Sequence, residues 1–296
     1  MGARMNKVLI VANKNSKQGS EFFQEVKNAL FARENDYTKF DFQQVDFQDS
    51  NLLQQAKAAH AILFFAEDKQ EEIAIETLRA NLGLYAQIST LLYQIDGLNH
   101  SLSIVQDKNG GIYCGEKGFS NNPSFGREAY DVERYSELEI ERTARVGYEF
   151  ANDSLRKLAL CDKADKLTTS KLWRKIVADL NEDYPFVSVN MQDVSKTIED
   201  IIVNPTSLDV VVTTALFGDI LTATSSCALK TTPSISFVCD TPLAMYGFCA
   251  ANTRYAKTPY ADAPSATPQG AAPLPIDLSS VKSLINFMLK NSFGIE

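Results

Sequence analysis

The sequence lacks the features that mark nucleic-acid-binding and membrane proteins. Its 29 Lys and Arg residues stand against 37 Asp and Glu residues, and a net charge of −8 without any basic run argues against a nucleic-acid surface. No apolar stretch approaches the roughly 20 residues of a membrane-spanning helix. The run from Val8 to Ala12 is followed at once by Asn13, which predicts a buried strand rather than a signal-peptide core.

Cysteine and histidine are also scarce, and their spacing argues against several kinds of site. The five cysteines form no C-x-x-C pair and no zinc-binding spacing, so we expect reduced thiols in a cytoplasmic protein. Neither of the two histidines lies near a G-x-S-x-G motif, which argues against a serine-hydrolase triad. No G-x-G-x-x-G motif is present, so the Rossmann fingerprint is absent too.

The hydrophobic pattern alternates strands with helices. The continuous apolar run from Ala61 to Ala66 is typical of a strand covered on both faces, and a helix is predicted to follow through Leu78 and Tyr85. Ser170 or Thr169 is the expected N-cap of a later helix. This alternation predicts an α/β protein with a largely parallel sheet, and 296 residues are enough for two domains. We predict strands at residues 7–12, 40–46, 61–66, 187–191 and 210–213, and helices at residues 20–31, 135–153, 171–180 and 278–288.

Three short segments in the second half of the chain supply residue types used in metal-assisted acid–base chemistry. Two Asp side chains can hold a hard divalent cation, which polarises a substrate oxygen. A Lys and a Tyr can then move protons. This combination points to chemistry on a hydroxy or keto acid. The candidate residues are Tyr113, Lys163, Asp193 and Asp219.

Each candidate has a simpler interpretation when it is taken alone. Tyr113 follows two glycines and could be a packed turn residue, whereas Lys163 stands between two Asp residues and could form surface salt bridges. Asp219 follows Gly218 ahead of an apolar run and could cap a helix. The order and the context of the four residues are what favour a functional site.

That context is carried by GGIYCG (110–115), YSELEIERTARVGYEFA (135–151), DKA with the helix around KLWRKIV, the DYP turn, and NPTSLDVVVTTALFGDIL (204–221). In order and approximate spacing, these segments resemble the β-decarboxylating dehydrogenases, the isopropylmalate and isocitrate dehydrogenase family. Weaker similarity extends back to Leu78–Ala86 and forward to Pro242–Asn252.

The resemblance implies an isopropylmalate-dehydrogenase-like α/β fold of two domains with an active-site cleft between them. Residues 1–86 and 230–296 would form the outer, cofactor-side domain, and residues 87–229 the inner dimerisation and catalytic domain. The Pro- and Ala-rich segment at residues 259–275 is expected to be a loop, either an ordered flap over the cleft or, as we favour, a surface excursion. The resemblance also implies a homodimer, in which Tyr113 and Asp219 of one subunit face the partner subunit's Lys163 and Asp193.

The implied reaction is hydride transfer from a 2-hydroxy acid to NAD or NADP, loss of the β-carboxylate, and protonation of the resulting enolate. By resemblance, Lys163 assists removal of the hydroxyl proton and Tyr113 protonates the enolate carbon. Asp193 and Asp219 would bind Mg²⁺ or Mn²⁺. Arg79 would bind a carboxylate of a small carboxylic-acid ligand, and Glu72 would lie beside the nicotinamide.

The sequence departs from the family where substrate and cofactor are recognised. Ser89 and Gln106 stand where the second and third substrate-binding arginines are expected, and Ala223 replaces a third metal-side Asp. The glycine-rich turn after the first strand is replaced by residues 13–17, which contain no glycine. Residues 248–253 likewise differ from the family's adenine-binding loop.

Three functions remain open. The first is a metal-dependent oxidoreductase that oxidises and decarboxylates a 2-hydroxy acid with altered substrate and cofactor recognition. The second is a non-oxidative decarboxylase or enolising enzyme. The third is a catalytically impaired paralogue that binds a ligand or partner. The retained residues favour the first two, and the usual activity of the family narrowly favours the first.

Overall fold

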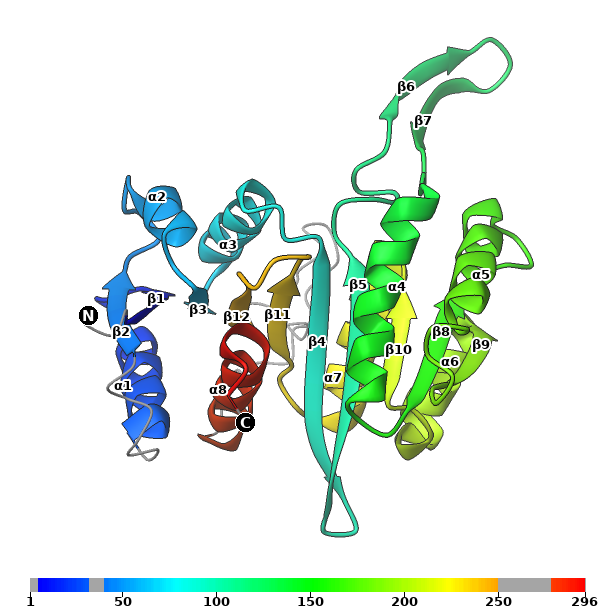
Figure 1. Cartoon of the computed structure of the whole chain (residues 1–296). Coiled ribbons are helices and arrows are strands. Elements are labelled where there is room, and N and C mark those ends of the chain that lie inside the picture. The colour runs from blue at the N-terminus through cyan, green and yellow to red at the C-terminus, as the bar shows by residue number, and fades with distance from the viewer. Residues whose placement is uncertain (1–4, 32–39, 250–277, 296) are drawn as a thin grey trace, which may run out of the picture. The chain divides into compact units, whose positions relative to one another are not determined.

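The computed structural model describes residues 5–31, 40–249 and 278–295, and Figure 1 shows their secondary structure. The chain divides into two compact units, unit 1 with residues 1–84 and 230–296 and unit 2 with residues 85–229. The expected domain boundaries were after residues 86 and 229. The predicted surface loop at residues 259–275 lies outside the described residues.

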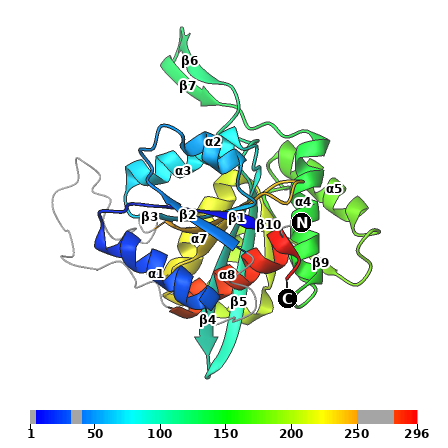
Figure 2. The ribbon, with the colours of Figure 1, turned by 60° about the vertical axis from the view of Figure 1, so that its left-hand side comes forward.

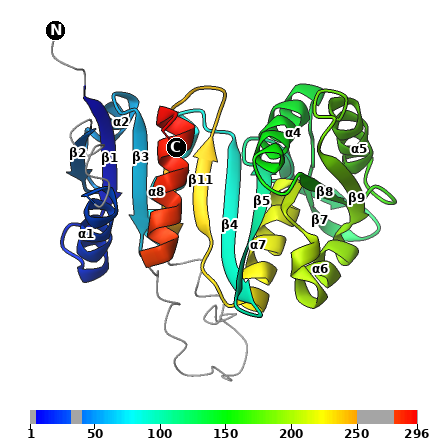
Figure 3. The ribbon, with the colours of Figure 1, turned by 60° about the horizontal axis from the view of Figure 1, so that its bottom comes forward.

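In its described residues, unit 1 consists of five neighbouring strands and four helices. These strands run in the order β2-β1-β3-β12-β11, and among them β11 is antiparallel to β12 while the other pairs are parallel. Helices α1 and α8 lie side by side (Figure 3). The elements are β1 (Asn6–Ala12), α1 (Lys17–Phe31), β2 (Phe40–Val45), α2 (Leu52–Lys57), β3 (Ala61–Ala66), α3 (Lys69–Asn81), β11 (Ser234–Val238), β12 (Met245–Cys249) and α8 (Leu278–Phe293).

Unit 1 is held together by the apolar strands that the sequence indicated. All six residues of β3 are buried, as expected for a strand covered on both faces. Phe64 of β3 stacks on Phe237 of β11 at 5.9 Å between ring centroids. Helix α3 begins after Asp68, whose side chain accepts hydrogen bonds from two backbone amides of the first turn.

The sheet strands of unit 2 run in the order β4-β5-β10-β8-β9. Strands β4 and β5 form an antiparallel hairpin, and β5, β10, β8 and β9 are parallel to one another. The elements are β4 (Ala86–Ile95), β5 (Leu98–Asp107), α4 (Glu137–Asn152), β8 (Lys157–Asp162), α5 (Thr168–Leu180), β9 (Ser188–Asp193), α6 (Val194–Val203), a 3-10 turn (Pro205–Ser207), β10 (Val210–Thr213) and α7 (Ala215–Leu229).

A two-stranded hairpin projects from the rest of unit 2 (Figure 2). It consists of β6 (Lys117–Asn122) and β7 (Gly126–Asp131), which pair antiparallel. Phe119 and Phe125 of this hairpin are 78% and 85% exposed, which is unusual for large apolar side chains. The hairpin follows directly on the GGIYCG segment, so its position bears on the candidate site.

Two local expectations are wrong. The helix predicted through Tyr85 ends at Asn81, because Gly83 adopts a positive φ of 72° and the chain turns into β4. Neither Ser170 nor Thr169 caps α5, whose N-cap is Leu167. The Ser170 hydroxyl instead accepts a hydrogen bond from the backbone amide of Lys163.

None of the helices in the described part of the chain combines the length and hydropathy needed to cross a bilayer.

Candidate active site

The carboxyl ends of the parallel strands in unit 2 meet at one edge of the sheet. The pairing places Thr213 beside both Gln106 and Cys161, and Cys161 beside Gln192. Each predicted catalytic or metal-binding residue follows or ends one of these strands. Tyr113 follows β5, Lys163 follows β8, Asp193 ends β9 and Asp219 lies in α7 after β10. Ligand sites of α/β sheets commonly lie at such an edge.

Tyr113 and Asp219 are brought together at this edge. The Tyr113 hydroxyl donates to Asp219 Oδ2 at 2.9 Å, and Gln106 Nε2 donates to Asp219 Oδ1 at 2.8 Å. A Cβ atom on Gly218 would lie 1.9 Å from Gln106 Oε1, so only glycine leaves room for this arrangement. Asp219 is the fifth residue of α7 and does not cap it. Both oxygens of its carboxylate therefore accept hydrogen bonds from uncharged donors.

The turn that carries Tyr113 is anchored by a buried carboxylate. Asp107 is fully buried and accepts hydrogen bonds from the backbone amides of Asn109 and Gly110, at 2.8 and 2.5 Å. Thr143 Oγ1 donates to it at 3.0 Å, and Arg142 forms an ion pair with it at 3.4 Å. These partners satisfy a charge that would otherwise be costly to bury.

Tyr135 links the Tyr113 turn to helix α7, and sequence reasoning did not single it out. Its hydroxyl accepts a hydrogen bond from the backbone amide of Ala215, the first residue of α7, at 3.2 Å. Its ring packs so closely on Gly111, which has a φ of +71°, that a Cβ there would lie 2.3 Å from the hydroxyl. Burial raises the pKa of Tyr135 well above its usual range, so the hydroxyl stays neutral. The paired glycines beside Tyr113 were the available signal for a ring packed against this turn.

Lys163 and Asp193 form a second pair. Lys163 Nζ lies 2.5 Å from Asp193 Oδ2 and 3.5 Å from Asp165 Oδ1. The hydrogen bond from Lys163 lowers the pKa of Asp193 to about 2, and the same bond raises the pKa of Lys163. Asp193 is also the N-cap of α6 and accepts from the backbone amide of Ser195 at 2.8 Å. Lys163 is consequently an ammonium at neutral pH.

The loop after β8 holds Lys163 in position. Asp162 is buried and receives two hydrogen bonds from the Arg174 guanidinium, at 2.6 Å from Nε and 3.0 Å from Nη2. Its Oδ1 also accepts from the backbone amide of Ala164 at 3.0 Å. This bidentate pair ties the end of β8 to α5 and limits the positions open to the lysine.

The two pairs stand apart within one chain. Strand β5 is separated from β8 by β10, and β9 lies one strand beyond β8. At the usual spacing of about 4.8 Å between strands, β5 is roughly 10 Å from β8 and 14 Å from β9. Within the described residues of one chain, no group of three or more His, Cys, Asp or Glu side chains is arranged to hold a metal ion.

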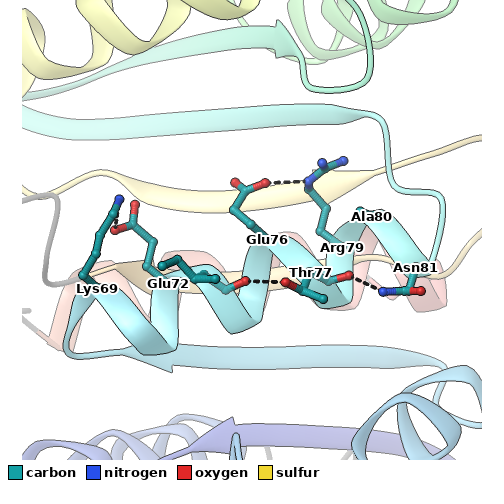
Figure 4. A pocket seen from close by; sticks show the side chains of 8 residues that line it. Lys69, Glu72, Glu76, Thr77, Arg79, Ala80 and Asn81 are labelled. Atoms are coloured by element: carbon teal, nitrogen blue, oxygen red, sulfur yellow. Dashed lines mark hydrogen bonds and ion pairs between the residues drawn. The ribbon is translucent and has the colours of Figure 1, made fainter. Parts of the chain in front are cut away.

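The residues predicted for substrate and nicotinamide both line a groove of about 430 Å³ along α3 in unit 1 (Figure 4). Lys69 Nζ and Glu72 Oε2 are 3.0 Å apart. Arg79 Nε donates to Glu76 Oε2 at 2.9 Å, and Arg79 Nη1 donates to the Leu84 carbonyl oxygen at 2.5 Å. The side chain of Arg79 is only 7% exposed, against 37% for Glu76.

The turn between β1 and α1 does not fit the phosphates of a dinucleotide. The Ser16 hydroxyl donates to Glu67 Oε1, which also accepts from the Gly19 backbone amide at 3.1 Å. Asn13 Nδ2 donates to Glu71 Oε1 at 3.3 Å. Burial, the largest effect, raises the pKa of Glu71. Carboxylates therefore occupy the start of α1, where a bound phosphate would be repelled.

The segment predicted to replace the adenine-binding loop is described only in part. Phe248 and Cys249 are buried in β12, where they belong to the sheet of unit 1. Residues 250–253 lie outside the described residues. The two described residues contribute to the core.

Comparison with known proteins assigns the family. A sequence model described as isocitrate/isopropylmalate dehydrogenase matches residues 7–243. A 3-isopropylmalate dehydrogenase of Staphylococcus epidermidis is 36% identical over 211 residues, which cover 64% of this chain and 59% of that protein. One from Desulfitobacterium hafniense is 38% identical over 174 residues, 54% of this chain and 48% of that protein. The chain thus spans about half to three-fifths of the length of these curated relatives.

Solved structures share the fold. The crystal structure of isocitrate dehydrogenase from Methylococcus capsulatus has a TM-score of 0.71 at 18% identity, and the match covers 97% of this chain and 85% of that one. A β-decarboxylating dehydrogenase from Thermococcus kodakarensis in its apo form has a TM-score of 0.67 at 22% identity, over 82% of this chain and 74% of that one. With a family match over most of its length, the chain belongs to the isocitrate/isopropylmalate dehydrogenase family of decarboxylating dehydrogenases.

Proposed function

We propose that this chain carries out the decarboxylating and proton-transferring part of its family's reaction, acting on a small 2-oxo acid without dinucleotide. The observation that carries the proposal is the contrast between the two units. Tyr113, Asp219, Lys163 and Asp193 are retained at the sheet edge of unit 2, whereas carboxylates occupy the α1 turn of unit 1. The sequence alone narrowly favoured the oxidative reaction over the non-oxidative one. Because of these contacts, we now rank the non-oxidative reaction first.

The protonation state of Lys163 supports the same choice. In the oxidative reaction the lysine must accept a proton from the substrate hydroxyl, which requires a neutral amine. In the chain without metal, the pair with Asp193 raises the pKa of Lys163 and so favours the ammonium form. An ammonium instead suits a reaction in which negative charge develops on a 2-oxo oxygen, because it can donate a hydrogen bond and a proton there.

The proposed step breaks the bond between carbon 3 and its carboxylate. Carbon dioxide leaves, and the electron pair of that bond forms an enolate. Tyr113 donates its hydroxyl proton to carbon 3, and solvent returns a proton to the phenolate, since the side chain is 45% exposed. Mg²⁺ or Mn²⁺, when bound by Asp219 and the partner subunit's Asp193, would supply stabilisation of the enolate charge.

We propose a homodimer as the working assembly. Two observations support it: the Lys163–Asp193 pair stands apart from the Tyr113–Asp219 pair within one chain, and the β6–β7 hairpin carries exposed aromatic side chains. Ile202 and Val203 of α6 are exposed as well.

We also propose a cytoplasmic location. All five cysteines are free in the structure, which supports it.

The proposed ligand is a small carboxylic acid with a neutral group facing Ser89 and Gln106. Both side chains are fully buried, and Gln106 Oε1 receives no hydrogen bond from the described residues. Neither side chain carries a charge, so neither can replace a guanidinium as the partner of a carboxylate. Loss of two guanidinium groups likewise disfavours a ligand with three carboxylates.

The test measures carbon dioxide release from 2-oxo-3-carboxylic acids, headed by oxaloacetate, with Mn²⁺ and no dinucleotide. Wild type should exceed Tyr113→Phe by about 100-fold, as expected for a lost general acid. Equal rates, no faster than with Mn²⁺ alone, would refute the proposal and favour a non-catalytic paralogue. Oxidation of 2-hydroxy acids with NAD or NADP, followed by absorbance of the reduced cofactor, tests the second candidate, which is favoured by the position of Glu72 in the α3 groove.

A further inference from the structure

The segment between β7 and α4 supports the turn that carries Tyr113. The carbonyl oxygen of Arg134 accepts a hydrogen bond from the Gly111 amide at 2.9 Å, and the Tyr135 ring lies against the same glycine. The Gly111 carbonyl oxygen in turn accepts from the Gly115 amide at 3.0 Å, which closes the turn around Tyr113. The position of Tyr113 is therefore tied to the chain at Arg134 and Tyr135.

The start of α5 supports the loop that carries Lys163. The hydroxyl of Ser170, which is fully buried, accepts a hydrogen bond from the Lys163 amide at 3.1 Å. The Lys163 carbonyl oxygen accepts from the Leu167 amide at 2.8 Å, just before the helix begins. Further along α5, Arg174 forms an ion pair with Asp162. The lysine is thus fixed to the first turns of α5 from both sides of its position in the sequence.

The two supports meet at Glu133 and Thr169. Thr169 Oγ1 donates a hydrogen bond to Glu133 Oε2 at 2.5 Å, across 36 positions of sequence. Both side chains are partly buried. On the next turn of α5, Trp173 packs edge-to-face on Tyr135 with ring centroids 5.4 Å apart. A hydrogen bond to a carboxylate is shorter and stronger than one between neutral groups, so the Glu133–Thr169 bond fixes the distance between the two supports.

We propose that Glu133 and Thr169 are positioning residues that connect the Tyr113 turn with the Lys163 loop, so that a displacement of either is passed to the other. The connection lies wholly within unit 2 of one chain. This inference rests on the proposed function, in which both Tyr113 and Lys163 take part. In the proposed homodimer, Tyr113 of one chain works with the partner subunit's Lys163. The Glu133–Thr169 bond then joins the two sites of the dimer through a continuous set of contacts.

The test is hydrogen–deuterium exchange of the intact protein without substrate, measured by mass spectrometry of peptides that cover residues 110–115 and 163–167. Thr169→Val keeps the shape of the side chain and removes its hydroxyl. Exchange should become at least about fivefold faster in both peptides, because loss of a hydrogen bond to a charged group lowers the free energy of local opening. Glu133→Leu removes the acceptor of the same bond and should produce the same two changes.

Two matched variants separate loss of the bond from general damage. Thr169→Ser keeps the hydroxyl and should exchange like wild type. Thr168→Val makes the same change at the neighbouring exposed position and should leave exchange at residues 110–115 unaltered. The midpoint of urea unfolding, followed by the fluorescence of Trp173, establishes that each variant is folded.

Faster exchange confined to residues 163–167 in Thr169→Val would overturn the connection. An equal effect of Thr168→Val, or no rescue by Thr169→Ser, would overturn it as well. Exchange is measured without substrate, so its result is separable from that of the carbon dioxide assay. Faster exchange in both peptides without decarboxylation refutes only the proposed function, whereas decarboxylation with unchanged exchange at residues 110–115 refutes only the connection.

Discussion

Gly218→Ala is expected to destabilise unit 2, although the same change in most helices has the opposite effect. Replacing glycine by alanine inside a helix ordinarily stabilises it by up to about 1 kcal/mol. At this position the new methyl group would lie 1.9 Å from Gln106 Oε1 and 2.7 Å from Gln106 Cβ. Gln106 is fully buried, so it cannot move aside into solvent.

The magnitude follows from two effects. Overpacking of a filled site costs about 1–3 kcal/mol. Displacing Gln106 also breaks its hydrogen bond to the Asp219 carboxylate, which is worth about 1.5–3 kcal/mol for a charged acceptor. After the helix preference of alanine is allowed for, the free energy of unfolding should fall by roughly 1.5–5 kcal/mol.

The assay uses the single tryptophan of the chain. Trp173 is fully buried in unit 2, so its fluorescence during urea unfolding reports on that unit. Gln106→Ala removes the two nearest contacts of the new methyl group. The double variant should therefore be more stable than the sum of the single effects predicts, by at least about 1 kcal/mol. A stabilised Gly218→Ala protein, or strictly additive effects, would refute the placement of Gln106 against Gly218.

Three further predictions concern the other contacts of the site. Asp193→Asn should lower stability at neutral pH but not at pH 2, because the pKa of Asp193 is depressed to about 2 and its pair with Lys163 stabilises the fold only while the carboxylate is charged. The difference in urea midpoint between wild type and variant should therefore be full above about pH 4 and shrink as the pH falls towards 2. A difference that stays constant over that interval would contradict the pairing. Tyr135→Phe should leave the Ala215 amide without its acceptor and lower the unfolding free energy by about 1–3 kcal/mol, measured by tryptophan fluorescence, and an unchanged value would remove Tyr135 from the site's support. Calorimetric titration with NAD should show no tight binding, because the Glu67 carboxylate lies at the start of α1 where the phosphates would bind. Tight binding without substrate would favour the dehydrogenase function instead.

Local sequence pattern was enough to predict about half of the helices and strands in the described residues. The run from Ala61 to Ala66 is uninterrupted by polar residues, so its burial as β3 follows from hydrophobicity alone. Helix α4 buries the apolar stripe that recurs at helical spacing from Ile140 to Ala151. The fold class and the family followed because the GGIYCG and FGD segments occur in the family's order.

The elements and contacts that the sequence did not predict correctly have physical causes outside the local sequence. The β4–β5 hairpin was not predicted, because Leu82 and Gly83 continue an apparently helical pattern until the positive φ of Gly83 ends it. Ser170 resembles an N-cap in sequence, but its hydroxyl is drawn to the Lys163 amide from the loop after β8. The Arg79–Glu76 ion pair could have been predicted from the sequence, because opposite charges three positions apart on a helix can meet.

The sequence by itself determined which residue types were available for chemistry and which were missing, because these depend only on identity and order. The tertiary structure decided which side chains meet. Tyr113 and Asp219 are 106 positions apart and share a hydrogen bond because β5 and β10 are neighbours in a parallel sheet. Glu67 reaches the start of α1 because β3 lies beside β1. Hydrogen bonds form between groups about 3 Å apart, and in a folded chain that proximity is set by strand order rather than by sequence separation.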